Sequence, residues 1–79
     1  MNLAEAVAKR TLELLVKTGK SQYRLIKETC LDKTTIQTIL KKKTKDIKLS
    51  TVFLIADAFN MNLTEFLDAD FFKKENIEV

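Results

Sequence analysis

The chain contains 79 residues and carries a formal net charge of +3, with one cysteine, one glycine, and neither histidine nor proline. A chain of this length builds one hydrophobic core, so we expect a single compact domain. The single cysteine excludes an internal disulfide and a thiolate metal cluster. The lack of histidine excludes a Ser-His-Asp triad or a Cys-His pair.

These exclusions argue against an enzyme. A site built from carboxylates alone, or from serine and lysine, is the enzymatic alternative, but so short a chain leaves little room for an enclosed substrate pocket. We therefore expect no catalytic residue, metal, cofactor or small-molecule ligand. The cysteine content fits a reducing, cytoplasmic location. The apolar run at residues 52–56 is far shorter than the roughly 18 residues that cross a bilayer, so we expect no membrane association.

Residues 3–18 are predicted to form the first helix. Their spacing of three, four and seven places one set of side chains on a single buried face: Ala4, Val7, Ala8, Thr11, Leu14 and Leu15. Asn2 and Glu5 resemble a capping box at its start, and Gly19 supplies the left-handed residue on which helices commonly end.

A second, short helix is predicted after Ser21, which is a suitable N-cap, and ends near Glu28. The segment Thr-Cys-Leu at residues 29–31 then interrupts the helical pattern. Isolated helices below about 12 residues are marginal in water, so the rest of the chain must hold this one in place.

A third helix is predicted after Asp32, which is its expected N-cap. Its buried stripe consists of Ile36, Ile39 and Leu40. Its outward face is polar and consists of Lys33, Thr34, Gln37, Thr38 and Lys41.

The segment from Ile47 to Asn60 fits two patterns. Alternating apolar residues between positions 47 and 55 would suit a strand, but the helical pattern is longer. We therefore predict a fourth helix over residues 51–59, with Ser50 as its N-cap and Asn60 in the left-handed conformation at its end.

A fifth helix is predicted to follow, since Asn62 and Glu65 form another N-cap pattern. The remaining tail either extends this helix or packs separately through Phe71 and Phe72.

The charges are unevenly distributed along the chain. Residues 20–48 contain nine basic and three acidic residues, a net charge of +6, whereas residues 49–79 contain two basic and six acidic residues, a net charge of −4. The positive part coincides with the broken helix pair, so a polyanion would meet that face first. The structural alternative is that Lys41–Lys43 are solvated and only suit the negative end of the third helix.

Two helices joined by a three-residue turn, with a polar outward face on the second, are the arrangement that enters the DNA major groove. Thr34 and Thr38 offer a hydroxyl for hydrogen bonding and a methyl that fits against thymine, and Lys33 can reach guanine acceptors. Lysines after the helix would neutralise phosphates.

In this order, the segments resemble the Cro and phage-repressor type of helix-turn-helix domain, the XRE family, over residues 7–67. The resemblance is carried by YRL in the second helix, Leu31 after the turn, TTIQTIL in the third helix and LSTVFLIADAFNMNLTEFL for the fourth and fifth. It implies an all-α, compact five-helix, lambda-repressor-like DNA-binding domain over residues 1–67. Residues 68–79 are then a C-terminal tail, which is either a helix extension or a dimer contact.

The resemblance also assigns DNA contacts residue by residue. The implied base-contacting residues are Lys33, Thr34, Gln37 and Thr38. The implied phosphate-contacting residues are Gln22, Tyr23, Lys41, Lys43, Thr44 and Lys45. A solvated helix face is the alternative for the two threonines, and a packing role is the alternative for Tyr23.

Two residues depart from the family pattern. Cys30 stands where the family usually has a turn glycine, which requires a non-glycine residue in a left-handed conformation at some cost in strain. Lys42 replaces another common glycine after the third helix. We interpret Cys30 as a buried or half-buried turn residue, with a redox sensor as the alternative.

Taken together, we expect a sequence-specific transcriptional regulator, a repressor, that binds an operator in double-stranded DNA as a homodimer. The expected dimer seam consists of apolar residues near the end of the chain: Phe66, Leu67, Phe71, Phe72 and Ile77. The alternative is that Phe71 and Phe72 fold back onto the first helix. The rival function is an antitoxin or protein-interaction module on the same fold, whose acidic second half binds a protein partner.

Overall fold

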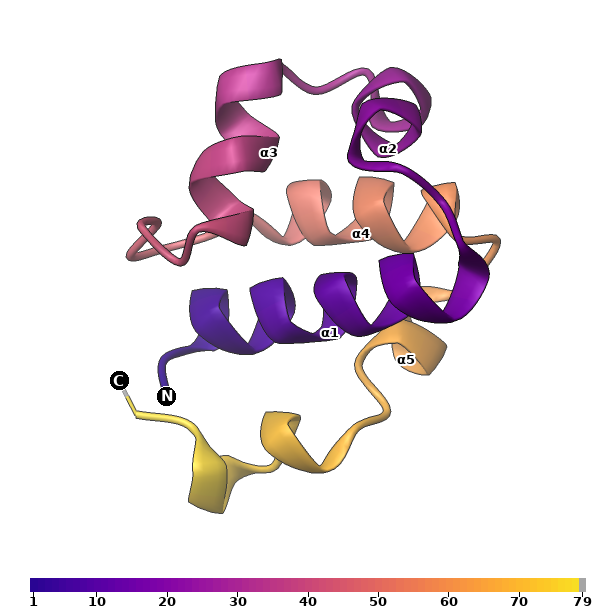
Figure 1. The fold of residues 1–79 in the computed structure, drawn as a ribbon. Coiled ribbons are helices and arrows are strands. Elements are labelled where there is room, and N and C mark those ends of the chain that lie inside the picture. The colour runs from indigo at the N-terminus through magenta and orange to yellow at the C-terminus, as the bar shows by residue number, and fades with distance from the viewer. Residues whose placement is uncertain (79) are drawn as a thin grey trace.

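A computed structural model describes residues 1–78, and over this range the chain is helical without a strand (Figure 1). Its elements are α1 (Leu3–Thr18), α2 (Gln22–Thr29), α3 (Lys33–Leu40), α4 (Leu49–Ala58), α5 (Leu63–Phe66) and the 3-10 helices η1 (Asp70–Phe72) and η2 (Lys74–Asn76). The prediction of an all-α, five-helix fold is confirmed, and the strand alternative for residues 47–55 is wrong.

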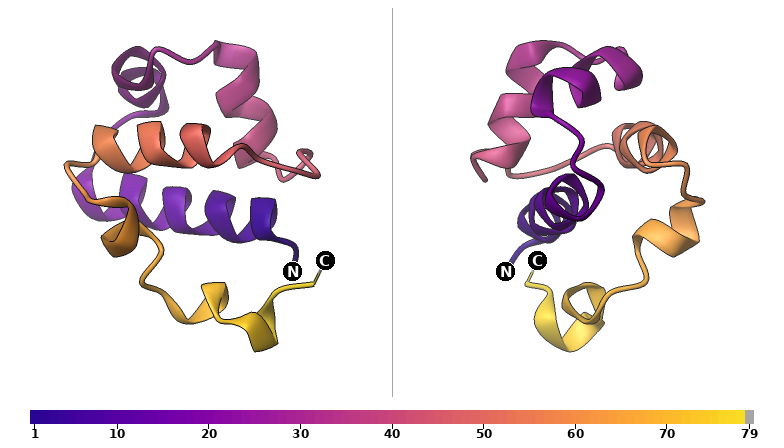
Figure 2. Two further views of the ribbon diagram at one scale, coloured as in Figure 1. Left: turned by 180° about the vertical axis from the view of Figure 1, so that it is seen from behind. Right: turned by 45° about the vertical axis from the view of Figure 1, so that its right-hand side comes forward.

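Helices α1 and α4 lie next to one another across the middle of the molecule (Figures 1 and 2). Helices α2 and α3 lie on one side of this pair, and the tail with η1 and η2 lies on the other side, below α1. The tail returns to the start of the chain, where the Glu78 amide donates to the Met1 carbonyl over 2.9 Å. The helix pair α2–α3 is thus supported from below by α1 and α4.

Two groups of buried apolar side chains hold these layers together. The larger group joins α1, α3, α4 and α5 and consists of Val7, Ala8, Leu14, Ile39, Val52, Ile55, Ala56 and Phe66. The smaller group joins α2 to α3 and consists of Leu25, Ile36 and Leu40. The predicted buried faces of α1 and α3 are confirmed, with Leu15 half-buried.

The predicted ends of α1 are confirmed. Asn2 Oδ1 accepts from the Glu5 amide and Glu5 Oε1 accepts from the Asn2 amide, each over 2.8 Å. At the other end, Gly19 has a φ of 73°. Helix α2 begins after Ser21, whose Oγ accepts from the Arg24 amide over 3.1 Å. These side chains satisfy amide groups that the first turn of a helix leaves unpaired.

Helix α4 begins earlier than predicted. Its N-cap is Lys48, whose carbonyl accepts from the Thr51 and Val52 amides over 3.0 and 3.2 Å. The prediction of Ser50 as N-cap is therefore wrong, because Ser50 lies within the first turn. Asn60 has a φ of 57°, which confirms the predicted left-handed end.

The tail packs separately rather than extending α5. The Phe72 ring lies 6.3 Å from the ring of Phe66, and Lys9 Nζ lies 4.9 Å from the centre of the Phe71 ring. The alternative in which these two phenylalanines fold back onto α1 is confirmed. The expectation that Phe66 belongs to a dimer seam is wrong because this side chain is fully buried. The other members of the expected seam are half-buried, and for them it stays a prediction: Leu67, Phe71, Phe72 and Ile77.

Replacing Ile36 with alanine should lower the free energy of unfolding by about 2 to 5 kcal/mol, because it leaves a cavity between α2 and α3. Ile36 is 1% exposed. Urea denaturation followed by circular dichroism measures the loss. The matched control is Thr64→Ala on the exposed side of α5, which should change stability by no more than about 0.5 kcal/mol. Equal losses in the two variants would contradict the role given to this group.

Candidate nucleic-acid interface

The turn between α2 and α3 contains three residues and no glycine. Cys30 adopts a left-handed conformation with a φ of 58°. The preceding Thr29 is buried, and its hydroxyl donates to the Leu25 carbonyl over 2.8 Å and accepts from the Leu31 amide over 3.3 Å. Thr29 therefore closes the end of α2 and sets the direction of the turn.

Cys30 itself is exposed, so the expectation of a buried or half-buried cysteine is wrong. Its thiol donates to the Lys27 carbonyl in the last turn of α2 over 3.9 Å, while Thr29 is buried and Leu31 half-buried. The sequence pattern identified the backbone conformation of Cys30 but not the exposure of its side chain.

The polar face of α3 lies opposite its buried stripe. Lys33, Thr34 and Lys41 are exposed, and Gln37 and Thr38 are half-buried. The Thr38 hydroxyl donates to the Thr34 carbonyl over 2.7 Å. Thr38 therefore uses its hydroxyl hydrogen within the helix, whereas no bond within the described chain occupies the Thr34 hydroxyl.

Residues from α2 and α3 share one shallow groove of about 390 Å³. It is lined by Gln22, Tyr23, Ile26, Lys33 and Gln37. Four of these are predicted contact residues, so the fold brings the first turn of α2 and the outward face of α3 to one surface.

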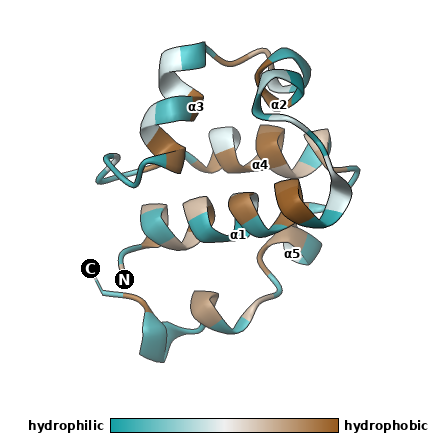
Figure 3. Ribbon diagram, viewed as in Figure 1, coloured by the Kyte–Doolittle hydropathy of each residue, from teal (hydrophilic) through white to brown (hydrophobic). Residues whose placement is uncertain are grey.

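The loop after α3 is hydrophilic (Figure 3), and its sequence from Lys41 to Lys45 contains four lysines. Lys42 has a φ of 60°, and the amides of Lys42 and Lys43 bond back to the Ile39 and Thr38 carbonyls over 2.9 and 3.0 Å. This is the left-handed end that replaces a glycine here. Lys41, Lys43 and Lys45 are exposed on the loop.

Thr44 differs from these lysines because it is half-buried. It lines a separate hollow together with Thr35, Ile39 and Thr51. Of the predicted phosphate-contacting residues on this loop, it is the one turned partly inward.

Helix α2 adds positive charge that the sequence reasoning missed. Lys27 Nζ lies 5.3 Å from the centre of the Tyr23 ring, and both side chains are exposed. Their spacing of four residues on a helix was the available signal. The contact places a cation beside one of the predicted phosphate-contacting residues.

Two other basic residues act within the fold. Arg10 donates from Nε to the Phe66 carbonyl over 2.8 Å and from Nη2 to the Glu65 carbonyl over 3.1 Å, which satisfies the end of α5. Lys20 donates to the Ala58 carbonyl at the end of α4 and forms an ion pair with Glu28. Cations are favourable at these helix ends because the last carbonyls carry partial negative charge.

Glu28 lies between two cations. The hydrogen bond from Lys20 lowers the pKa of this carboxyl below its ordinary value, and Arg24 Nη2, 3.0 Å from Glu28 Oε2, lowers it further, while desolvation acts in the opposite direction. The three side chains join the start and end of α2 to the end of α4.

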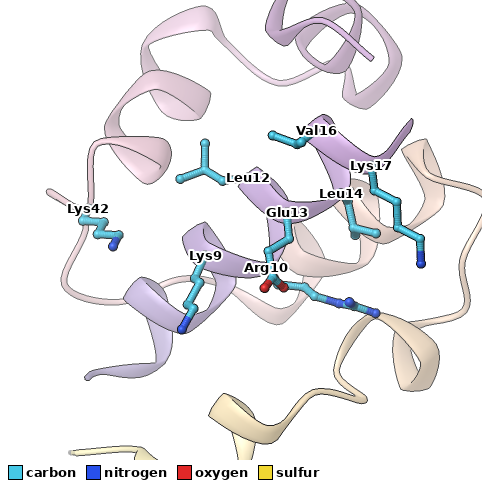
Figure 4. A pocket seen from close by; sticks show the side chains of 8 residues that line it. All are labelled: Lys9, Arg10, Leu12, Glu13, Leu14, Val16, Lys17 and Lys42. Atoms are coloured by element: carbon cyan, nitrogen blue, oxygen red, sulfur yellow. The ribbon is translucent and has the colours of Figure 1, made fainter. Parts of the chain in front are cut away.

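A hollow of about 650 Å³ runs along α1 (Figure 4). Its lining consists of Lys9, Arg10, Leu12, Glu13, Leu14, Val16, Lys17 and Lys42. The polar side chains diverge in this view: Lys9 points toward the tail and Arg10 toward α5, whereas Leu12 and Val16 point toward α2 and α3. A ligand site normally has polar groups that converge, so this hollow does not have the form of a substrate pocket.

Among residues 1–78, no group of three or more acidic, cysteine or histidine side chains is arranged to hold a metal ion. None of the described helices is long and apolar enough to span a bilayer.

A short helix, a three-residue turn and a second short helix with a free polar face define a helix-turn-helix DNA-binding domain. The family model of the Cro/C1-type HTH DNA-binding domain matches residues 12–71, a span that includes all of α2 and α3. The chain therefore belongs to the Cro/C1-type HTH DNA-binding family. No curated protein and no solved structure matches the chain significantly.

Replacing Glu28 with glutamine should lower the melting temperature at pH 7. The melting temperature of the variant should also fall less than that of the wild type as the pH is lowered. The pKa of Glu28 is lowered in the folded state, so its stabilising contribution is present above the ordinary glutamate pKa of about 4.3 and is lost as the pH falls through the folded value. Thermal melts from pH 7 to pH 2 should show the two proteins converging in acid.

Glu13→Gln is the matched control, because Glu13 is exposed and forms no ion pair within the described chain. This variant should match the wild type at every pH. A stability difference for Glu28→Gln that stays constant down to pH 2 would show that its carboxylate charge does not stabilise the fold.

Proposed function

We propose that the protein is a sequence-specific, double-stranded DNA-binding transcriptional regulator that inserts α3 into the major groove of an operator. The observation that carries this proposal is the free polar face of α3, which shares one surface with the start of α2 and adjoins the lysine loop. The major groove is about 12 Å wide and accepts one helix with its side chains.

The side chains on this face suit direct contacts with base edges. Lys33 at the start of α3 can donate to the guanine O6 and N7 acceptors, and Gln37 can bond an adenine through both its amide groups. The Thr38 hydroxyl donates its hydrogen to the Thr34 carbonyl of the same helix. Its oxygen can still accept a hydrogen bond from a base amino group, and its methyl group can contact a thymine methyl.

The surrounding groups suit phosphate contacts. Gln22 and Tyr23 line the α2 side of the shared groove. The exposed lysines lie on the loop that follows the end of α3: Lys41, Lys43 and Lys45. Thr44 lies among these lysines and completes the proposed set. Such contacts fix the position of a protein on the duplex without reading the sequence.

A homodimer on a twofold-related operator fits this geometry. One recognition helix covers only a few base pairs, whereas two helices about 34 Å apart would read successive major grooves on one face of the duplex. A protein bound over that length blocks access for other proteins, which is why we propose a repressor. Selection from random duplex DNA, followed by titration of the selected site, tests the proposal, and a lack of any sequence preference would contradict it.

Replacing Lys41, Lys43 or Lys45 singly with alanine should weaken binding to all duplex sequences by a similar factor. Each variant should lower the slope of log affinity against log salt by about one unit, because one phosphate contact fewer releases one counterion fewer. Fluorescence anisotropy at several salt concentrations measures this slope.

Lys74→Ala is the control, because Lys74 is exposed in η2, which lies on the other side of α1 from α2 and α3 (Figure 1). It should leave the slope unchanged. A loss confined to one DNA sequence would mean that the loop lysine in question reads bases.

Thr34→Ala and Thr38→Ala should each change the preference at one base pair by about 1 to 3 kcal/mol. Their stability should change by no more than about 0.5 kcal/mol, because neither side chain belongs to the buried groups. Competition titrations against operator variants measure the preference, and thermal melts measure the stability. An unaltered preference in both variants would remove these threonines from the proposed base contacts.

A further inference from the structure

Helix α1 carries two exposed apolar side chains on its outer side. Leu12 is 39% exposed and Val16 is 85% exposed, and both line the hollow of about 650 Å³ along this helix. They lie four residues apart, so they are neighbours on the helix surface and form one short apolar row. An apolar row inside a hollow offers a partner protein a place to bury its own apolar side chains.

Positive charge surrounds this apolar row. The lining of the hollow contains four basic residues and one acidic residue. Arg10 is occupied by the carbonyls at the end of α5. The other three basic residues, Lys9, Lys17 and Lys42, are exposed and form no ion pair within residues 1–78. The hollow therefore lacks the negative charge that would balance these lysines.

A charged row of α1 runs beside the apolar row. Lys9, Glu13 and Lys17 follow one another at intervals of four residues, so the signs of their charges alternate along the helix. The two lysines are separated by eight residues, which is about 12 Å along the helix axis. A second helix that matches this row carries an acidic, a basic and an acidic residue at the same spacing.

We propose that the hollow along α1 binds an acidic amphipathic helix of a different protein. Two apolar side chains of that helix, four residues apart, pack on Leu12 and Val16. Its carboxylates pair with Lys9 and Lys17 on one helix and with Lys42 on the loop after α3. The apolar contact gives affinity, and the charge pairs select an acidic partner.

The form of the hollow suits a helix better than a small molecule. Its polar side chains diverge along α1 and do not converge on one point (Figure 4). A small ligand needs convergent polar groups, whereas a partner helix contacts a series of groups spread along its length.

A second copy of this chain is a poor occupant because the charges of the hollow are not complementary to themselves. Two copies of α1 packed antiparallel about a twofold axis would bring Glu13 against Glu13 and Lys9 against Lys17, since both lysines are four residues from Glu13. In any other orientation, two linings with an excess of positive charge would still face one another.

Duplex DNA is also a poor occupant. Its backbone supplies negative charge but no apolar side chain that would cover Leu12 and Val16. None of the residues assigned to base contacts lines the hollow, and Lys42 is the one lining residue that comes from the loop after α3. The proposed partner therefore binds beside the proposed DNA-binding surface without using the outward face of α3.

Peptide selection on the immobilised full chain tests the proposal. The probe is a displayed library of random peptides about 16 residues long, because shorter helices are marginal in water. The selected peptides should have an excess of acidic residues and two apolar residues four positions apart. A lack of any peptide that binds more tightly than about 100 μM would overturn the proposal, as would selected peptides without the acidic excess.

Titration of a selected peptide by fluorescence anisotropy tests the apolar row. Val16→Asp should weaken peptide binding by about tenfold or more, because it places a carboxylate at the centre of the contact. Leu49→Asp is the matched control, because Leu49 is an apolar residue with 64% exposure that does not line the hollow. Circular dichroism shows whether both variants are folded. Equal affinity of Val16→Asp and the wild type would overturn the proposal, as would equal loss in Val16→Asp and Leu49→Asp.

A charge exchange tests the ion pairs. Lys17→Glu should weaken peptide binding by about two- to tenfold, and Lys74→Glu, which changes a lysine of η2, should not. A set of peptides in which each acidic residue in turn becomes lysine should contain one that restores binding to Lys17→Glu and binds the wild type more weakly. If no peptide of the set restores binding, the proposed pairing is wrong.

The two other occupants give different results with the same variant. Self-association of the wild type that is lost in Val16→Asp, measured by sedimentation equilibrium, would assign the hollow to a second copy. Weaker binding of Val16→Asp to duplex DNA would assign it to DNA. Either result would overturn the proposal of an acidic helix.

This inference and the proposed function can fail separately. Lys33→Ala should weaken DNA binding and leave peptide binding unchanged, because Lys33 does not line the hollow. A wild type that binds the selected peptides but no duplex DNA would contradict the proposed function alone. A wild type that binds DNA with sequence preference but selects no peptide would contradict this inference alone.

Discussion

The packing of Leu25 against Ile36 and Leu40 is the interaction on which the rest of the DNA-binding surface depends. Helices α2 and α3 contain eight residues each, too few for either to be stable alone in water. Burial of these three side chains fixes one helix against the other, and Ile39 attaches α3 to the main core. The position of each outward side chain on α3 follows from this packing, because residues on the opposite face of a short helix have no other support.

The basic residues of the chain have two different uses, which a count of charges does not separate. Arg10 and Lys20 point inward and bond the last carbonyls of α5 and α4, so that α1 and the segment after it hold both helices. The lysines at positions 41, 43 and 45 are exposed and form no ion pair within residues 1–78. The excess of positive charge available to a polyanion is therefore concentrated on the loop after α3.

Helix periodicity and end signals predicted the parts of the fold that local chemistry determines. The capping box at Asn2, the left-handed residues at Gly19 and Asn60, and the buried stripe of α3 all depend on neighbours in the sequence, and all were predictable. The start of α4 was not, because Lys48 is an unusual N-cap and a better candidate, Ser50, follows it. The burial of Phe66 and the turning inward of Thr44 depend on contacts with distant segments. The outward positions of the candidate contact residues on α3 could be predicted from its buried stripe. The contact between Lys27 and Tyr23 was not predicted and is seen only in the structure.

Helix α2 is joined to the central helices by a short rigid path. Helix α2 packs on α4, and Lys20 links Glu28 at the end of α2 to the Ala58 carbonyl at the end of α4. Helix α3 is held in turn by α2 and by α1. The outward face of α3 is therefore positioned by packed helices and not by a flexible linker, so the proposed base contacts and phosphate contacts keep one fixed arrangement.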